Sequence, residues 1–150
     1  MDNIGLAKRL IDPPDGDWQP LLDHLAEDVV FNVTIPGDTP ISGEFRGRRA
    51  VTEHFARLGY LLEFRQERPM EFLGSGDHVV VLGRESFLIK KNRATVSGSE
   101  YADVLDFRDG LITASSSSKT CRPWWTPTGA HSHRCTTPSG RTCRDGSGPL

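Results

Sequence analysis

The stretch SEYADVLDFRDGLIT, residues 99–113, indicates how the chain folds. Successive side chains of a strand point to opposite sides, so one face would carry the odd-numbered positions. These are Tyr101, Asp103, Leu105 and Phe107. The pair Asp109-Gly110 is typical of a tight turn, and apolar residues resume after it. The stretch therefore predicts a strand, a turn and the start of another strand, with one carboxylate on an aromatic and apolar face.

Two further strand segments precede this one, and short turns separate all three. The first covers about residues 61–73, and GSGD leads from it into HVVVLGRESFLIK, residues 78–90. KNRA then leads into TVSGSEYADVLDF, residues 95–107. Strands this long, joined by tight turns, predict a strongly curved antiparallel sheet wrapped around helices. The expected fold class is α+β, a cone with an internal cavity.

The part of the chain before these strands predicts two helices and one more strand. Asp17 is placed as an N-cap before WQPLLDHLAED, in which apolar residues recur at helical spacing. The β-branched run 29–35 predicts a strand that closes at Pro36-Gly37. A second helix is expected over residues 48–58, with Gly59 as its stop.

In this order of elements the sequence resembles the SnoaL-like polyketide cyclases and ketosteroid-isomerase-like proteins of the nuclear-transport-factor-2-like superfamily. The matching segments are LAEDVVFNV, GEFRGRRAVTEHF and YADVLDFRDGLIT, and the resemblance covers residues 4–113. It implies a cone that binds a small apolar or polycyclic molecule, and a homodimer for the intact form. The fold hosts isomerases, cyclases, epoxide hydrolases, dehydratases and non-catalytic modules, so function depends on the cavity.

Asp103 is the leading catalytic candidate. By its place in ADVLDF it matches the acid that stays protonated in ketosteroid isomerases and donates to the dienolate oxygen. Val33 stands where that family has its proton-shuttling Asp, so steroid isomerisation itself is not expected. His54 is the second catalytic candidate, as a general base, with a core-edge histidine bonded to a backbone group as the alternative.

Five further side chains are expected to line the cavity and contact a ligand. Glu85 would line it or pair with Arg84, unless it is an ordinary solvated strand residue, and Trp18 would cover the cone more readily than stack on a ligand. The full set of expected ligand-binding residues is Tyr101, Trp18, Phe87, Glu85 and Phe55. The expected activity is acid–base chemistry of the isomerase, cyclase or hydratase type. The alternative is a non-catalytic ligand-binding or dimerisation module, inactive in this form because of its C-terminus.

After Ala114 the composition changes to Ser, Thr, Pro, Cys and Arg. Read one base earlier, codons compatible with residues 114–125 would encode four apolar residues, a helix cap and the start of an amphipathic helix. This pattern suggests a frameshift after about Thr113, and a natural flexible tail is the alternative. The expected domain is 1–113, with a disordered or frameshifted tail at 114–150. The last strand and terminal helix of the fold are then expected to be missing.

Charge and composition limit the expected partners. The net charge of −2 divides into −6 for residues 1–113 and +4 for residues 114–150, so the acidic domain is not expected to bind nucleic acid. No stretch has the length of a signal peptide or membrane span, which predicts a cytoplasmic protein. Cys121, Cys135 and Cys143 lack the paired spacing of a zinc site, and no Gly-rich turn could hold a dinucleotide. No metal or cofactor is expected.

Overall fold

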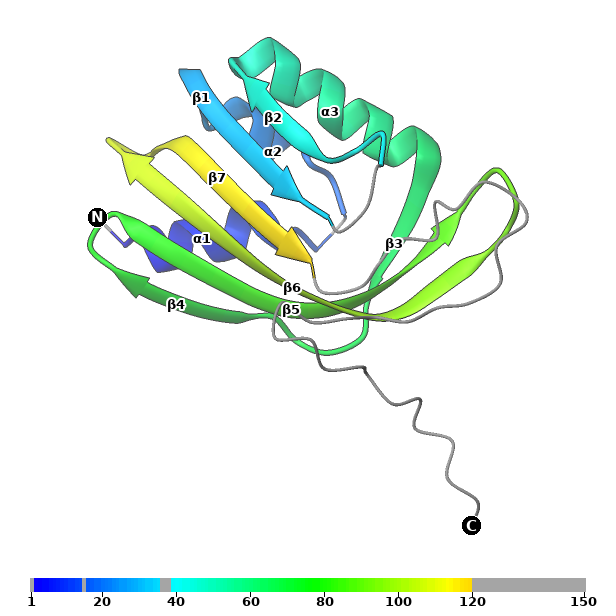
Figure 1. The fold of residues 1–150 in the computed structure, drawn as a ribbon. Helices are drawn as coiled ribbons and strands as arrows, with labels where there is room; N and C mark the ends of the chain where they lie inside the picture. The colour runs from blue at the N-terminus through cyan, green and yellow to red at the C-terminus, as the bar shows by residue number, and fades with distance from the viewer. Residues whose placement is uncertain (1, 15, 36–38, 120–150) are drawn as a thin grey trace, which may run out of the picture.

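A computed structural model describes residues 2–14, 16–35 and 39–119 of the chain. These residues form three helices and one sheet, and Figure 1 shows the helices beside the curved sheet. The elements are α1 (Asn3–Ile11), α2 (Gln19–Asp23), β1 (Leu25–Thr34), β2 (Gly43–Arg46), α3 (Arg48–Leu61), β3 (Leu62–Gln66), β4 (Glu71–Ser75), β5 (His78–Ile89), β6 (Thr95–Arg108) and β7 (Leu111–Lys119). The three cysteines and the expected turn at Pro36-Gly37 lie outside the described residues.

The sheet is mixed, which corrects the expectation of a purely antiparallel one. Its strand order is β2-β1-β7-β6-β5-β3, and β4 also pairs with β5. Every pairing is antiparallel except that of β1 with β7, which run parallel. Side-chain alternation reports which face a residue occupies, but it carries no information about the direction of a partner strand far along the chain. The hairpin signals therefore predicted the local pairings and missed this distant one.

Several boundaries differ from the sequence-based ones. The segment expected as a helix through residue 28 contains only the short α2, and β1 already begins at Leu25. Its leucines fit a helical face, yet Leu25 and Val29 are fully buried in the sheet, so tertiary packing overrides the local pattern. The expected strand 61–73 is two strands, interrupted around Pro69. Helix α3 continues past Gly59 to Leu61.

The sheet also does not stop after Thr113. β7 continues to Lys119 between β6 and β1, and Ser115 is buried. The expectation of a missing last strand is therefore wrong for residues 114–119. Backbone hydrogen bonds to two neighbouring strands do not require apolar side chains, and serine is small enough for a central position. The frameshift interpretation itself stays a prediction, since residues 120–150 lie outside the described part.

One main cluster of apolar residues holds the helices against the sheet. Ala7 and Leu10 of α1 pack with Val79 and Val81 of β5 and with Leu105 of β6. Burying each of these leucine and valine side chains contributes about 1.5–3 kcal/mol relative to leaving it exposed. This packing places α1 and the sheet core in one continuous unit.

The entry into α3 depends on a glycine. Gly47 has φ 86°, a region that other residues rarely adopt, and its N–H donates to the Val29 carbonyl at 2.7 Å. The chain turns here from β2 into α3. The turn places α3 beside β1 and β2, where its buried residues Val51 and His54 reach the interior.

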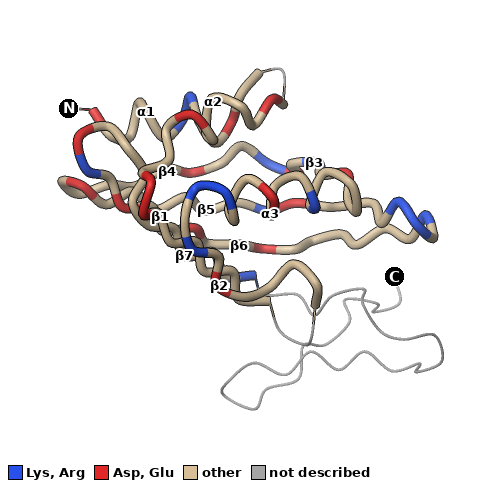
Figure 2. Tube along the Cα trace, turned by 90° about the horizontal axis from the view of Figure 1, so that it is seen from above, with Lys and Arg blue, Asp and Glu red and all other residues tan. Residues whose placement is uncertain are grey.

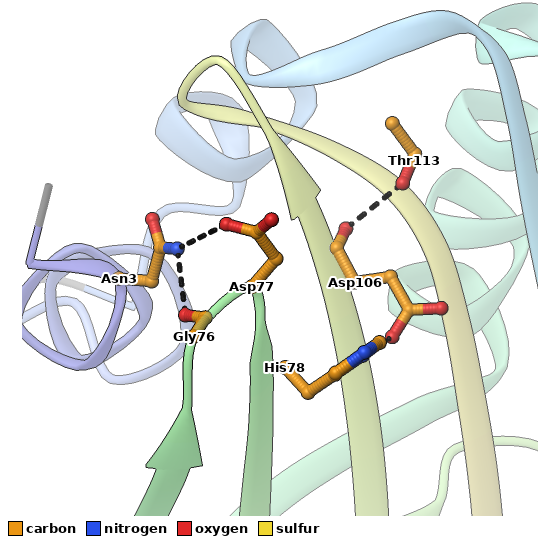
Figure 3. A network of polar contacts seen from close by, with 6 residues as sticks. All are labelled: Asn3, Gly76, Asp77, His78, Asp106 and Thr113. Atoms are coloured by element: carbon orange, nitrogen blue, oxygen red, sulfur yellow. Dashed lines mark hydrogen bonds and ion pairs between the residues drawn. The ribbon is translucent and has the colours of Figure 1, made fainter.

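A polar network fastens the start of α1 to the far end of the β4–β5 hairpin, as Figure 3 shows. Asn3 donates from Nδ2 to the Gly76 carbonyl at 3.1 Å and to Asp77 Oδ1 at 3.4 Å. His78 Nδ1 lies 2.6 Å from Asp106 Oδ1 on the neighbouring strand. The Asn3 contacts join the start of α1 to the turn between β4 and β5, and the His78–Asp106 contact joins β5 to β6.

Lys90, Lys91 and Arg93 lie together at the tip of the β5–β6 hairpin (Figure 2). In the part of the chain that the structure describes, no helix is long and apolar enough to cross a membrane.

Candidate functional site: a cavity between sheet and helix

A cavity of about 490 Å³ lies between the curved sheet and the helices. This volume falls in the range of small-molecule sites, roughly 300–1,000 Å³. Two parts of its lining differ in character. We call "sheet wall" the polar set from β3, β5, β6 and β7, which comprises Gln66, Glu85, Tyr101, Asp103, Ser117 and Lys119. We call "helix wall" the set Trp18, His54, Phe55 and Leu58.

Strand register explains why the sheet wall gathers its polar groups. Asp103 on β6 pairs with Ser117 on β7, and Tyr101 pairs with Lys119. On the other side of β6, Glu85 of β5 pairs with Ser99 and also faces Gln66 of β3. Directly opposite residues share one face of a sheet, so the alternation of four strands sends these side chains to the interior.

The Asp103 carboxyl is buried with one oxygen unsatisfied. Its Oδ1 is buried and has no hydrogen-bond partner among the described residues. Burial raises the pKa of Asp103, while a hydrogen bond from Ser117 and the charge of Lys119 act in the opposite direction. Burial thus shifts the carboxyl towards its neutral form, which can donate a hydrogen bond.

Tyr101 lies beside this acid with its hydroxyl already engaged. The hydroxyl donates to Gln66 Oε1 at 3.0 Å, and the Nζ of Lys119 lies 4.9 Å from the ring centroid. Burial raises the pKa of Tyr101, and the neighbouring Glu85 and Asp103 raise it further. The phenol therefore stays protonated at neutral pH and leaves its oxygen lone pairs as acceptors.

Glu85 forms a buried ion pair with Lys119. Their side chains are only 6% and 16% exposed, and Lys119 Nζ donates to Glu85 Oε1. Burial raises the pKa of Glu85 more than the Lys119 charge lowers it. The interpretation of Glu85 as a solvated residue is thus wrong, and its partner is not Arg84, which binds Glu67 at 2.8 Å.

His54 occupies the helix wall, 4% exposed, with its ring stacked on Phe45 at a centroid distance of 4.1 Å. Within the described part of the chain its Nδ1 is buried without a partner, so no backbone group satisfies that atom. Burial, aided by Arg57, lowers the pKa of His54 to about 4. The imidazole is neutral at pH 7 and is a weak proton acceptor.

The aromatic candidates separate into cavity residues and a core residue. Trp18, 38% exposed, contacts Phe55 at 5.4 Å between centroids, which fits a residue that covers the cavity. Phe55 in turn contacts Phe31 at 5.9 Å. Phe87 is not among the described lining residues. It packs on Phe64 in a second core cluster, beyond the register shift that follows Glu85.

Four functional candidates were not foreseen. Ser115, Ser117 and Lys119 come from β7, whose serines lack the alternation that would have marked a strand. Gln66 ends a short strand in a segment that was expected to be one long one. Among the described residues, no three His, Cys, Asp or Glu side chains are grouped so that they could hold a metal ion.

Comparisons with known proteins agree on the fold. Residues 14–115 match the family model described as the SnoaL-like domain. A nuclear-transport-factor-2-like protein from Burkholderia xenovorans is 24% identical, with TM-score 0.69 over 78% of this chain and 88% of that chain. A candidate polyketide cyclase from Xanthomonas campestris is 21% identical, with TM-score 0.63 over 78% of this chain and 92% of its own.

A protein of ketosteroid isomerase-like fold from Catenulispora acidiphila, solved in complex with trimethylamine, is 19% identical. Its TM-score is 0.54 over 77% of this chain and 81% of that chain. Among curated proteins, nothing matches significantly. At these identities the likeness shows the fold, and the chemistry has to be argued from the cavity.

Proposed function

The chain belongs to the SnoaL-like domain family, and we propose that its cavity binds a small apolar molecule that carries one polar oxygen group. The apolar body would lie against the helix wall, and the oxygen would accept a hydrogen bond from Asp103. Such a ligand would be a ketone, a phenol or an enol. Small-molecule sites commonly combine apolar walls with a few converging polar groups, as this cavity does.

The observation that carries the proposal is the unsatisfied, buried oxygen of Asp103. A buried polar atom without a partner costs about 1–3 kcal/mol. A ligand that satisfies the carboxyl recovers this cost, whereas a purely apolar ligand does not. The raised pKa favours the neutral carboxyl of Asp103. In that form Asp103 would be the donor of the hydrogen bond, and a carbonyl or enolate oxygen of the ligand would be the acceptor.

The reaction class that fits is proton transfer beside a carbonyl group, as in an isomerase, cyclase or hydratase. Asp103 would stabilise the developing oxyanion or supply a proton to it. A partner base would remove a proton from carbon, and Glu85 and His54 are the two candidates. Neither cofactor nor metal enters this scheme, because every step moves a proton between side chains and ligand.

One observation favours a second candidate function, binding without catalysis. Glu85 is held by Lys119, and the pKa of His54 at about 4 makes it a weak base. A cavity with a strong donor and no strong base would bind a ketone or phenol and leave it unchanged. Measuring whether the protein converts a bound ligand into a product distinguishes catalysis from binding alone.

The test uses carboxyl carbon-13 NMR of Asp103 together with calorimetric binding of 2-naphthol. We expect Asp103 to titrate above the ordinary aspartate range and its signal to shift on binding. Asp103→Leu should weaken binding about tenfold, as expected for the loss of one buried hydrogen bond worth about 1.4 kcal/mol. Asp103→Asn, which keeps a donor, is the matched control. An ordinary titration of Asp103, or equal binding by all three proteins, would reject the proposal.

We also propose that the chain forms a homodimer through the outer face of the sheet. Leu73, Val80 and Val104 pair in sequence across β4, β5 and β6, and Leu73 and Val104 are 48% and 38% exposed. A second copy would cover this apolar row. Sedimentation of wild type and Val104→Lys should show a dimer and a monomer, and a monomeric wild type would contradict the proposal.

A further inference from the structure

We infer that Gly83 determines the size of ligand that the cavity accepts. Because residue 83 has no side chain, the Tyr101 ring has room to lie close to β5 on the sheet wall of the cavity. The inference deepens the proposed function and rests on it for its ligand. Gly83 itself is not among the lining residues of the cavity, so its effect is exerted through Tyr101. It is therefore a positioning residue.

The contact between the two residues is unusually close. Gly83 on β5 pairs directly with Tyr101 on β6, in the buried series of its strand. A Cβ added at Gly83 would lie 2.2 Å from both Cζ and Oη of Tyr101 and 2.6 Å from Cε1. Ordinary contacts of a Cβ are 3.4–4 Å. The ring therefore lies over the space that any other residue at position 83 would fill.

Contacts beyond the glycine fix the ring in this position. From its origin on β6 the side chain passes over β5, and its hydroxyl reaches Gln66 on β3. The Nζ of Lys119, from β7 on the other side of β6, lies 4.9 Å from the ring centroid. Tyr101 is only 7% exposed. The ring thus lies across two neighbouring strands and forms part of the sheet wall of the cavity.

A side chain at position 83 would push the Tyr101 ring away from β5. Restoring an ordinary contact requires the ring to move by more than about 1 Å, and closely packed interiors do not absorb such a change without loss. Movement away from β5 brings the ring into the cavity, beside Asp103, and stretches the bond to Gln66. A large ligand would then lose space next to the acid, whereas a small one would still fit.

The ligand test compares phenol with a four-ring phenolic steroid, both titrated by calorimetry into wild type and Gly83→Ala. We expect the steroid to bind about tenfold more weakly to the variant, the scale of discrimination that one methylene group produces in an apolar pocket. Phenol should change less than about threefold. Equal losses for both probes, or no loss, would overturn the inference while leaving the proposed function in place. A wild type that binds neither probe would overturn both.

Three further measurements keep the inference testable if Gly83→Ala folds poorly. In wild type, NMR should show nuclear Overhauser contacts between the Gly83 Hα atoms and the Tyr101 ring, and their absence would contradict the geometry. Gly59→Ala, at another part of the cavity lining, adds a methyl group where nothing lies within 4 Å, and it should leave the Tyr101 signals unchanged. The double variant Gly83→Ala/Tyr101→Leu removes the displaced ring and should regain steroid binding. Failure of this rescue would show that Gly83→Ala acts by another route.

Discussion

The sheet wall and the helix wall of the cavity surround their buried titratable groups with different neighbours. Both hold titratable groups that are driven towards their neutral forms, Asp103 on the sheet and His54 on the helix. The sheet wall surrounds its acid with a hydroxyl and an ammonium group, whereas His54 packs against Phe45 and Phe55. On the sheet wall, burial favours neutral Asp103 although Ser117 and Lys119 act in the opposite direction. On the helix wall, burial and the charge of Arg57 act together to keep His54 neutral.

The largest effect should come from removing the cation of the sheet wall. Lys119→Met leaves the buried Glu85 carboxylate without its partner, and breaking such a pair costs about 3–5 kcal/mol. We expect a loss of this order in urea unfolding at pH 8 and a smaller loss at pH 5, where Glu85 can protonate. Glu85→Gln/Lys119→Met, which removes both charges, is the control. If Lys119→Met is as stable as wild type, Lys119 does not form the buried ion pair with Glu85.

The helix wall should lose stability in acid because of His54. The pKa of His54 is about 4 in the folded chain and 6.5 unfolded, so the unfolded chain binds more protons between these values. The contribution is fully present above pH 6.5 and falls as the pH drops towards 4. At about 1.36 kcal/mol per pKa unit, it amounts to about 3 kcal/mol.

This contribution can be isolated by unfolding His54→Phe across the same pH range. The variant should lack that part of the acid-induced loss of stability. Parallel pH curves for wild type and His54→Phe would contradict the assignment of the loss to His54.

Asp103 should show the opposite pH response. Because its pKa is raised on folding, the folded chain binds more protons, and its contribution to stability decreases as the pH rises through the folded pKa. Asp103→Asn removes this penalty and should stabilise the protein at pH 8 relative to pH 5. Urea midpoints at pH 5 and pH 8 measure it. A destabilising Asp103→Asn at pH 8 would mean that the carboxylate is well solvated or fully paired.

The smallest expected change concerns Ser117. Its hydrogen bond lowers the pKa of Asp103, so Ser117→Ala should raise that pKa further and cost about 0.5–1.5 kcal/mol. Carboxyl NMR of Asp103 reports the titration directly. Ser116→Ala, on the opposite face of β7, is the matched control. If Asp103 titrates identically in Ser117→Ala and Ser116→Ala, Ser117 does not influence the Asp103 carboxyl.

Much of the sheet wall could be predicted from alternation alone. Tyr101, Leu105 and Phe107 are buried, as the odd-numbered positions of β6 indicated, and Asp103 and Glu85 line the cavity. The two-residue alternation of side chains is a property of a single strand, so it predicts the buried face without knowledge of the neighbouring strands. The part played by β7 could not be foreseen, because Ser115 and Ser117 carry no apolar signal. Resequencing codons 110–126 would test the frameshift interpretation of this region.

The sequence by itself determined the fold class, the hairpin order of β5 and β6, and the face of the strand that carries Asp103. These features depend on turn residues and alternating polarity, which act over a few residues. Only the tertiary structure decided that β7 lies parallel to β1, that Lys119 meets Glu85, and that Tyr101 lies over Gly83. Each of these contacts joins segments distant along the chain, and their register depends on how the whole sheet curves around the helices.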